Sequence, residues 1–155
     1  MKKNARSSPA LAAALLLAAS AAAVSGCDKA PSSSPARDTP PKTMKGACTG
    51  PATAVTVFVE WNGSVATTRN KTVYVCEGKD WVEWVSCEGE ISEQISWKDG
   101  SPFDEPPRHE KDKKVLKSRP AKKGLAGKGF DYEIEFVPPG GSKPVRIDPR
   151  IEILP

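Results

Sequence analysis

The sequence predicts an all-β domain, a sandwich or a barrel, and three observations support this. Several short segments alternate apolar and polar residues with a period of two, which is typical of half-buried strands. Stretches rich in Gly, Asn, Asp and Pro separate these segments. No window beyond the N-terminal leader has the apolar period of a helix. Short strands divided by turns favour two packed sheets.

The expected strands occupy the last two thirds of the chain. The first ends at Asn62-Gly63, a dipeptide that favours tight turns. The clearest is 130–137, in which aromatic and aliphatic residues alternate with acidic ones, and Pro138-Pro139 ends it. The expected strands are 55–61, 72–76, 81–85, 91–97, 115–116, 130–137, 145–147 and 151–153.

The first 26 residues have the layout of a secretory signal peptide. Lys2, Lys3 and Arg6 precede an uncharged run, residues 10–24, made mostly of Ala and Leu. This run is shorter than the roughly 20 residues that a membrane-spanning helix needs. The leader therefore predicts export from the cytoplasm.

The four residues Val24-Ser25-Gly26-Cys27 resemble the lipobox of bacterial lipoproteins. The resemblance implies cleavage before Cys27, a diacylglyceryl thioether on its sulfur and acylation of the new amino group. The protein would then be anchored to a membrane of the cell envelope on the periplasmic side. The alternative is an ordinary signal peptide followed by a chance cysteine.

The composition after Cys27 predicts a tether and then one domain. The 18 residues from Asp28 to Lys45 include four prolines and no large apolar residue before Met44, so they cannot bury enough surface to fold. As a flexible coil they would span about 23 Å on average. We expect three parts: 1–26 signal peptide, 27–45 lipidated N-terminus and flexible, disordered linker, and 46–155 β-sandwich domain.

The segment from Val73 to Trp84, which reads VYVCEGKDWVEW, resembles the strand-turn-strand of cupredoxin-like domains, with Lys79 as one extra residue in the turn. The resemblance implies an antiparallel Greek-key β-sandwich, cupredoxin-like or immunoglobulin-like, of about seven strands. It does not imply copper. A blue-copper site needs two imidazoles, and this chain has one histidine, His109.

Catalytic and metal-binding roles find little support in the sequence. His109 lies in a highly charged run, which is a poor place to orient a catalytic histidine. Asp131, Glu133 and Glu135 share one face of a strand and offer oxygen ligands for calcium, but a solvent-facing sheet surface has the same pattern. We expect no enzyme activity, no cofactor and no metal.

With Cys27 lipidated, Cys48, Cys76 and Cys87 remain, and we expect one disulfide and one free thiol. If strands 53–61 and 72–76 form an antiparallel pair, Cys48 and Cys76 lie at one end and Cys87 at the other. This geometry favours Cys48–Cys76, and Cys76–Cys87 is the alternative. A remaining Cys87 would pair between chains or be buried.

The charges are balanced overall and segregated along the chain. Without Lys2, Lys3 and Arg6, 20 of the 23 basic side chains remain against 19 acidic ones, so no nucleic-acid partner is expected. Residues 77–105 carry a net −7, and residues 108–128 carry a net +7. The candidate interaction residues in the basic segment are Lys113, Lys114, Lys117, Arg119, Lys122 and Lys123. The alternative is a solvated loop folded against the acidic segment.

The sequence therefore predicts a non-catalytic interaction module that offers its basic loop or a sheet edge to an envelope protein or to anionic lipid. One alternative is an inhibitor of a periplasmic enzyme, because Cys76-Glu77-Gly78 resembles the start of a strand in lipid-anchored lysozyme inhibitors. Another alternative is a metal carrier.

Overall fold

The computed structural model describes residues 48–110, 112–141 and 143–155, and every regular element in them is a β-strand. The expected strands are all present within a few residues of their predicted bounds. The strands are β1 (Ala54–Trp61), β2 (Ala66–Thr68), β3 (Thr72–Cys76), β4 (Trp81–Ser86), β5 (Glu90–Trp97), β6 (Arg108–His109), β7 (Val115–Lys117), β8 (Gly129–Val137), β9 (Val145–Ile147) and β10 (Arg150–Leu154).

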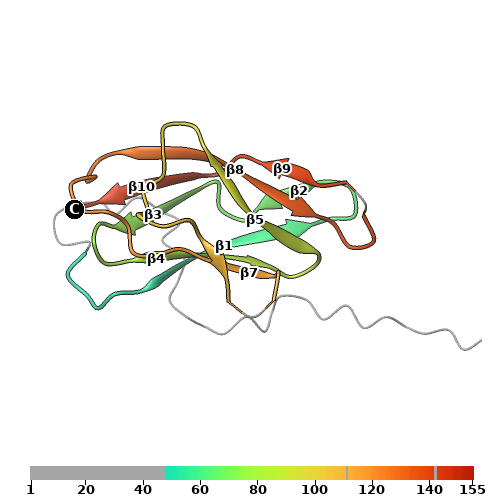
Figure 1. The fold of residues 1–155 in the computed structure, drawn as a ribbon, viewed down its shortest axis with the longest axis horizontal. Coiled ribbons are helices and arrows are strands. Elements are labelled where there is room, and N and C mark those ends of the chain that lie inside the picture. Colours follow the sequence, from blue (N-terminus) through green and yellow to red (C-terminus); the bar gives the residue numbers. More distant parts are fainter. Residues whose placement is uncertain (1–47, 111, 142) are drawn as a thin grey trace, which may run out of the picture.

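The strands form two five-stranded layers that face each other (Figure 1). The first sheet has the order β2-β1-β4-β7-β6. The second has the order β3-β10-β8-β5, and β9 pairs with β8 beside β10. The all-β class is thereby confirmed, and the arrangement is consistent with a β-sandwich. The described part of the chain has no helix long and apolar enough to cross a membrane.

The expectation of purely antiparallel sheets is wrong, because each sheet contains one parallel pair. β1 runs parallel to β4 in the first sheet, and β10 runs parallel to β3 in the second. The chain leaves the first sheet after β2, forms β3 in the second sheet, and returns through the turn at residues 77–80 to form β4. Since this excursion brings the chain back to the end where β1 begins, β4 pairs with β1 in the same direction.

Apolar side chains from alternate positions fill the space between the sheets. β8 shows this best, since Phe130, Tyr132, Ile134 and Phe136 are buried while the residues between them are half-buried. At the centre the Trp84 indole N–H donates to the Tyr132 hydroxyl at 2.9 Å, and the two rings meet edge to face at 5.9 Å between centroids. Both side chains are fully buried, so this pair joins β4 of one sheet to β8 of the other.

The sandwich has two ends, which we name by the cysteines that lie there. The Cys48 end carries the 77–80 turn, the loop at residues 118–128 and the C-terminus, and it lies on the left in Figure 1. The Cys87 end carries the turns at 62–65 and 87–89, the turn that follows β8, and Lys113 and Lys114 just before β7. These ends determine which of the charged residues lie near one another.

Replacing Tyr132 with Phe removes the hydroxyl that accepts from the buried Trp84 N–H, without opening a large cavity. We expect Tyr132→Phe to lower the free energy of unfolding by about 1–2 kcal/mol, because an unpaired buried donor loses its solvation without compensation. Urea denaturation measures the change. The control is Tyr74→Phe at a half-buried tyrosine of β3; equal stability losses in the two variants would contradict a special role for the Trp84–Tyr132 bond.

Candidate interaction site

The basic segment does not form one surface, because β7 separates its two groups of lysines. Lys113 and Lys114 belong to the hairpin at the Cys87 end, where their carbonyls accept from the N–H groups of Ile91 and Ser86. Lys122 belongs to the loop at the Cys48 end, where its N–H donates to the Pro102 carbonyl. The predicted site residues therefore lie at opposite ends of the sandwich, with Lys117 on the strand between them.

Most of the predicted residues are held by carboxylates. The ion pairs are Lys113 with Glu90, Lys117 with Glu83 and Glu110, Arg119 with Glu105, and Lys122 with Asp104, at nitrogen–oxygen distances of 2.9 to 3.9 Å. Four of these five acids come from the acidic segment, so the two opposed segments fold onto each other. This supports the alternative of a solvated region folded against the acidic half. Exposed pairs of this kind contribute little stability individually, roughly 0–1 kcal/mol each.

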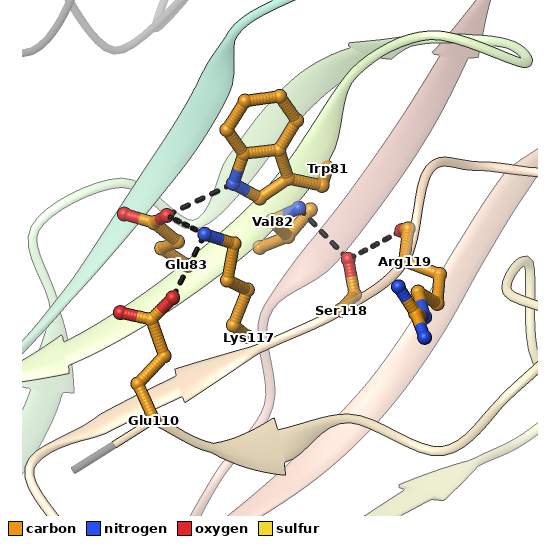
Figure 2. A network of polar contacts seen from close by, with 7 residues as sticks. All are labelled: Trp81, Val82, Glu83, Glu110, Lys117, Ser118 and Arg119. Atoms are coloured by element: carbon orange, nitrogen blue, oxygen red, sulfur yellow. Dashed lines mark hydrogen bonds and ion pairs between the residues drawn. The ribbon is translucent and has the colours of Figure 1, made fainter.

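Lys117 lies at the centre of the densest of these networks (Figure 2). Its Nζ is 2.9 Å from a Glu110 oxygen and 3.2 Å from a Glu83 oxygen, and it lies 5.1 Å from the centroid of the Trp81 ring. The Trp81 indole N–H donates to the same Glu83 oxygen at 2.9 Å. The hydrogen bond to Glu110, with further help from Glu83, raises the pKa of Lys117 above its ordinary value against an opposing effect of burial. The charged form of Lys117 is thus stabilised by two carboxylates, whereas a nucleophilic lysine needs a lowered pKa.

The turn at residues 77–80 fixes the loop that follows β7. The Glu77 carboxylate accepts from three consecutive backbone N–H groups, those of Gly124, Leu125 and Ala126, at 2.7, 3.0 and 3.2 Å. The Gly78 N–H donates to the Ala121 carbonyl at 2.6 Å. The loop that the sequence offers as a solvated basic segment is therefore held in place by one carboxylate.

This loop carries Lys122, Lys123 and Lys128. Lys123 packs its stem against Gly78, since a Cβ added there would lie 2.7 Å from Lys123 Cγ. Lys123 and Lys128 are exposed, and within the described ranges neither has a carboxylate partner. The predicted set omitted Lys128, because sequence spacing alone did not indicate that the loop folds back beside Lys122.

A hollow of about 490 Å³ opens beside these lysines. Leu125 and Phe130 supply its apolar part, and Lys122 and Lys128 supply positive charge. The lining residues are Asp99, Gly100, Ser101, Lys122, Leu125, Lys128, Gly129 and Phe130. The hollow thus combines two cations, one carboxylate and an apolar wall at the Cys48 end.

A larger groove of about 590 Å³ follows the outer edge of β5. Ile95, Trp97 and Phe103 line it together with the acidic Glu93 and Asp104. The pairing of β5 with β8 is irregular between Ile91 and Ile95. Bulges and charges of this kind protect a sheet edge against a further strand. This edge is therefore poorly suited to the strand addition that an edge-docking partner requires.

The residues weighed for catalysis or metal binding have partners within the protein. The His109 Nδ1 lies 3.2 Å from the Val115 carbonyl oxygen. The three carboxylates of β8 do share one face, and they pair with arginines: Asp131 with Arg150 at 2.9 Å, and Glu133 and Glu135 with Arg146 at 3.4 and 3.2 Å. Among the residues that the structure describes, no three His, Cys, Asp or Glu side chains form a group suited to a metal ion.

The Cys48–Cys76 disulfide is confirmed, with the two Cα atoms 5.6 Å apart. The expected antiparallel pairing of these two strands is wrong: β1 and β3 lie in different, facing sheets. They still run in opposite directions, so the start of β1 and the end of β3 share one end of the sandwich.

The expectation of one free thiol is wrong, because Cys87 is disulfide-bonded too. Its partner lies outside the described residues, as does Cys27 with its predicted lipid. An acylated sulfur forms no disulfide, so a lipid on Cys27 and a bond from Cys27 to Cys87 exclude each other.

No family model matches this chain, and no curated protein matches its sequence. Functional inference therefore depends on the sequence motifs and the contacts described above.

Replacing Glu77 with Ala tests whether this carboxylate fixes the basic loop. We expect Glu77→Ala to accelerate hydrogen exchange at the amides of residues 124–126 and to lower the free energy of unfolding by about 1–3 kcal/mol, since three N–H groups lose a charged acceptor. Hydrogen-exchange mass spectrometry measures the first effect. The control is Glu93→Ala on the exposed bulge of β5, which should leave these amides unchanged. Unaltered exchange in Glu77→Ala would show that other contacts hold the loop.

Proposed function

We propose that this chain is a lipid-anchored protein of the bacterial cell envelope, and that its folded domain is a non-catalytic interaction module on the periplasmic side. The observation that carries the proposal is the position of Val24-Ser25-Gly26-Cys27, directly after an apolar run too short to span a membrane. A proline-rich stretch then separates Cys27 from the folded domain. This order is the one expected of a lipid anchor at Cys27, a linker and a folded domain.

The Cys48–Cys76 disulfide supports an exported location. Disulfides persist in oxidising compartments such as the periplasm and are rare in the cytosol. A disulfide that joins the start of the domain to the end of β3 also keeps the N-terminal segment attached at a defined place. The disulfide thus supports export to an oxidising compartment. It also fixes the point at which the N-terminal segment joins the domain.

The polar side chains favour binding over catalysis. Lys117 has a raised pKa in a cage of two carboxylates, and the His109 ring contacts a backbone carbonyl. A catalytic base or nucleophile instead needs a pKa moved toward neutrality and an accessible partner. The surface ion pairs hold Lys113, Lys117, Arg119 and Lys122 against carboxylates, and Lys123 and Lys128 are among the exposed cations without such a partner in the described ranges.

For the finer fold we propose the cupredoxin-like or immunoglobulin-like Greek-key sandwich. Its support is the segment from Val73 to Trp84, which forms β3, the 77–80 turn and β4 and so crosses from one sheet to the other. Within this segment Gly78 has a φ of 63°, a conformation that glycine adopts readily, and Asp80 is buried. Core and turn requirements therefore account for the residues that carry the resemblance.

The same reasoning weakens the inhibitor alternative. Cys76 forms a disulfide, Glu77 accepts three backbone hydrogen bonds and Gly78 occupies a left-handed turn position. All three residues of that short match have structural roles, so the match does not on its own indicate an inhibitor.

The anchor is tested by replacing Cys27 with Ser and fractionating the cells. We expect wild-type protein in the membrane fraction and Cys27→Ser in the soluble fraction, because the lipid contributes roughly 0.8 kcal/mol per buried CH₂ and two or more chains hold stably. The matched control is Cys87→Ser, which removes a cysteine but leaves the lipobox intact and should remain with the membrane. Membrane sedimentation of Cys27→Ser at unchanged size would refute the anchor, as would a soluble wild type.

A further inference from the structure

The point at which the chain enters the domain is fixed at one end of the sandwich. Cys48 is bonded to Cys76 at the end of β3, and the Thr53 N–H donates to the Asp80 carboxylate at 3.1 Å. The Lys79 Nζ donates to the Cys48 carbonyl at 2.7 Å. Any segment that leads from an anchored Cys27 to the domain must therefore arrive at the Cys48 end.

The same end carries the lysine-bearing loop. The Ala121 N–H donates to the Asp80 carbonyl at 3.0 Å, and the Gly127 N–H donates to the Ile153 carbonyl at 2.8 Å. These bonds hold the loop across the 77–80 turn and beside the last strand. Lys122, Lys123 and Lys128 are thus held around the place where the chain enters.

The charge at this end is available for an external partner. Lys123 and Lys128 have no carboxylate partner within the described ranges, and the pair of Lys122 with Asp104 is long, at 3.9 Å. At the Cys87 end Lys113 pairs with Glu90 at 3.2 Å, and Lys114 and Lys143 are exposed without a carboxylate partner in the described ranges, so what distinguishes the Cys48 end is the hollow beside its lysines. Asp99 is the one carboxylate that lines the hollow with Lys122 and Lys128, so the hollow keeps a positive balance.

The hollow has the chemistry of a site for an amphipathic anion. Two ammonium groups offer donors to phosphate oxygens, and Leu125 and Phe130 offer an apolar wall. A phospholipid supplies both features, because its head group carries phosphate oxygens and its acyl chains are apolar. An acidic protein surface would supply the charge alone.

We propose that the Cys48 end faces the membrane and that Lys122, Lys123 and Lys128 contact the phosphate groups of anionic lipids. This inference rests on the proposed anchor for its orientation, because residues 28–47 would join an anchored Cys27 directly to this end of the domain. Tethering raises the effective concentration of the surface, so weak contacts suffice. The contact orients the sandwich and presents the Cys87 end to the periplasm.

The test uses the mature chain carrying Cys27→Ser, so that any binding is independent of acylation. The probes are vesicles of phosphatidylcholine alone and of phosphatidylcholine mixed with phosphatidylglycerol, in co-sedimentation. We expect binding to the mixed vesicles, none to the neutral ones, and loss of binding at high salt. Lys122→Gln, Lys123→Gln and Lys128→Gln together should weaken binding on the order of 100-fold, about fivefold per lysine.

The matched control removes three lysines at the Cys87 end: Lys113→Gln, Lys114→Gln and Lys143→Gln. It has the same net charge as the test variant and should bind like the parent. Equal losses in the two variants would show a non-directional charge effect and overturn the proposal, as would no binding to the mixed vesicles. Circular dichroism is the measurement that checks whether both variants fold.

A further arm adds inorganic phosphate at constant ionic strength. Little competition supports a lipid surface, whereas release of the protein would mean that the site takes free phosphate and would overturn the membrane assignment. The cell-fractionation result for Cys27→Ser is independent of these assays. Anchoring without vesicle binding refutes the orientation alone, and vesicle binding without anchoring refutes the lipid anchor alone.

Discussion

The buried Asp80 carboxylate is the contact on which the arrangement of this domain depends. It is fully buried, and its oxygens accept from the Thr53 N–H just before β1 and from the Cys76 N–H at the end of β3. Its own carbonyl accepts from Ala121 after β7. One residue thus joins strands of both sheets where the chain crosses between them. A buried carboxylate is stable only when its hydrogen bonds are satisfied, so these segments must keep their positions together.

This constraint determines how charge is distributed over the molecule. Because the loop after β7 is fixed to the 77–80 turn, the lysines at residues 122–128 lie where the chain enters, and Lys113 and Lys114 lie at the Cys87 end. The acidic and basic segments, which nearly cancel in the sequence, pair where Lys117 of β7 contacts Glu83 of β4 and where Lys113 contacts Glu90. Lys123 and Lys128, in the loop at the Cys48 end, keep no carboxylate partner within the described ranges. The fold therefore neutralises part of the basic segment and leaves two of its cations exposed where the chain enters.

Much of the fold follows from the sequence, because its strands have strong local signals. The period of two in β8 and the Asn62-Gly63 turn predict elements that the structure contains. The strands β2 and β6 have three and two residues and too little pattern to be recognised. The parallel pairs were not predictable either, since they result from the chain changing sheets at residues 69–71 and 77–80, which no local pattern records. For the same reason the basic segment was interpreted as one surface, whereas β7 divides it.

Peptide mapping, without reduction, of the protein from the membrane fraction examines Cys27 and the disulfides in one measurement. We expect an N-terminal peptide that begins at Cys27 and carries acyl chains, together with a peptide in which Cys48 is joined to Cys76. A lipidated Cys27 also requires that any disulfide at Cys87 joins it to another molecule. An unacylated Cys27 joined to Cys87 of the same chain would contradict the anchor and, with it, the membrane-facing orientation of the Cys48 end.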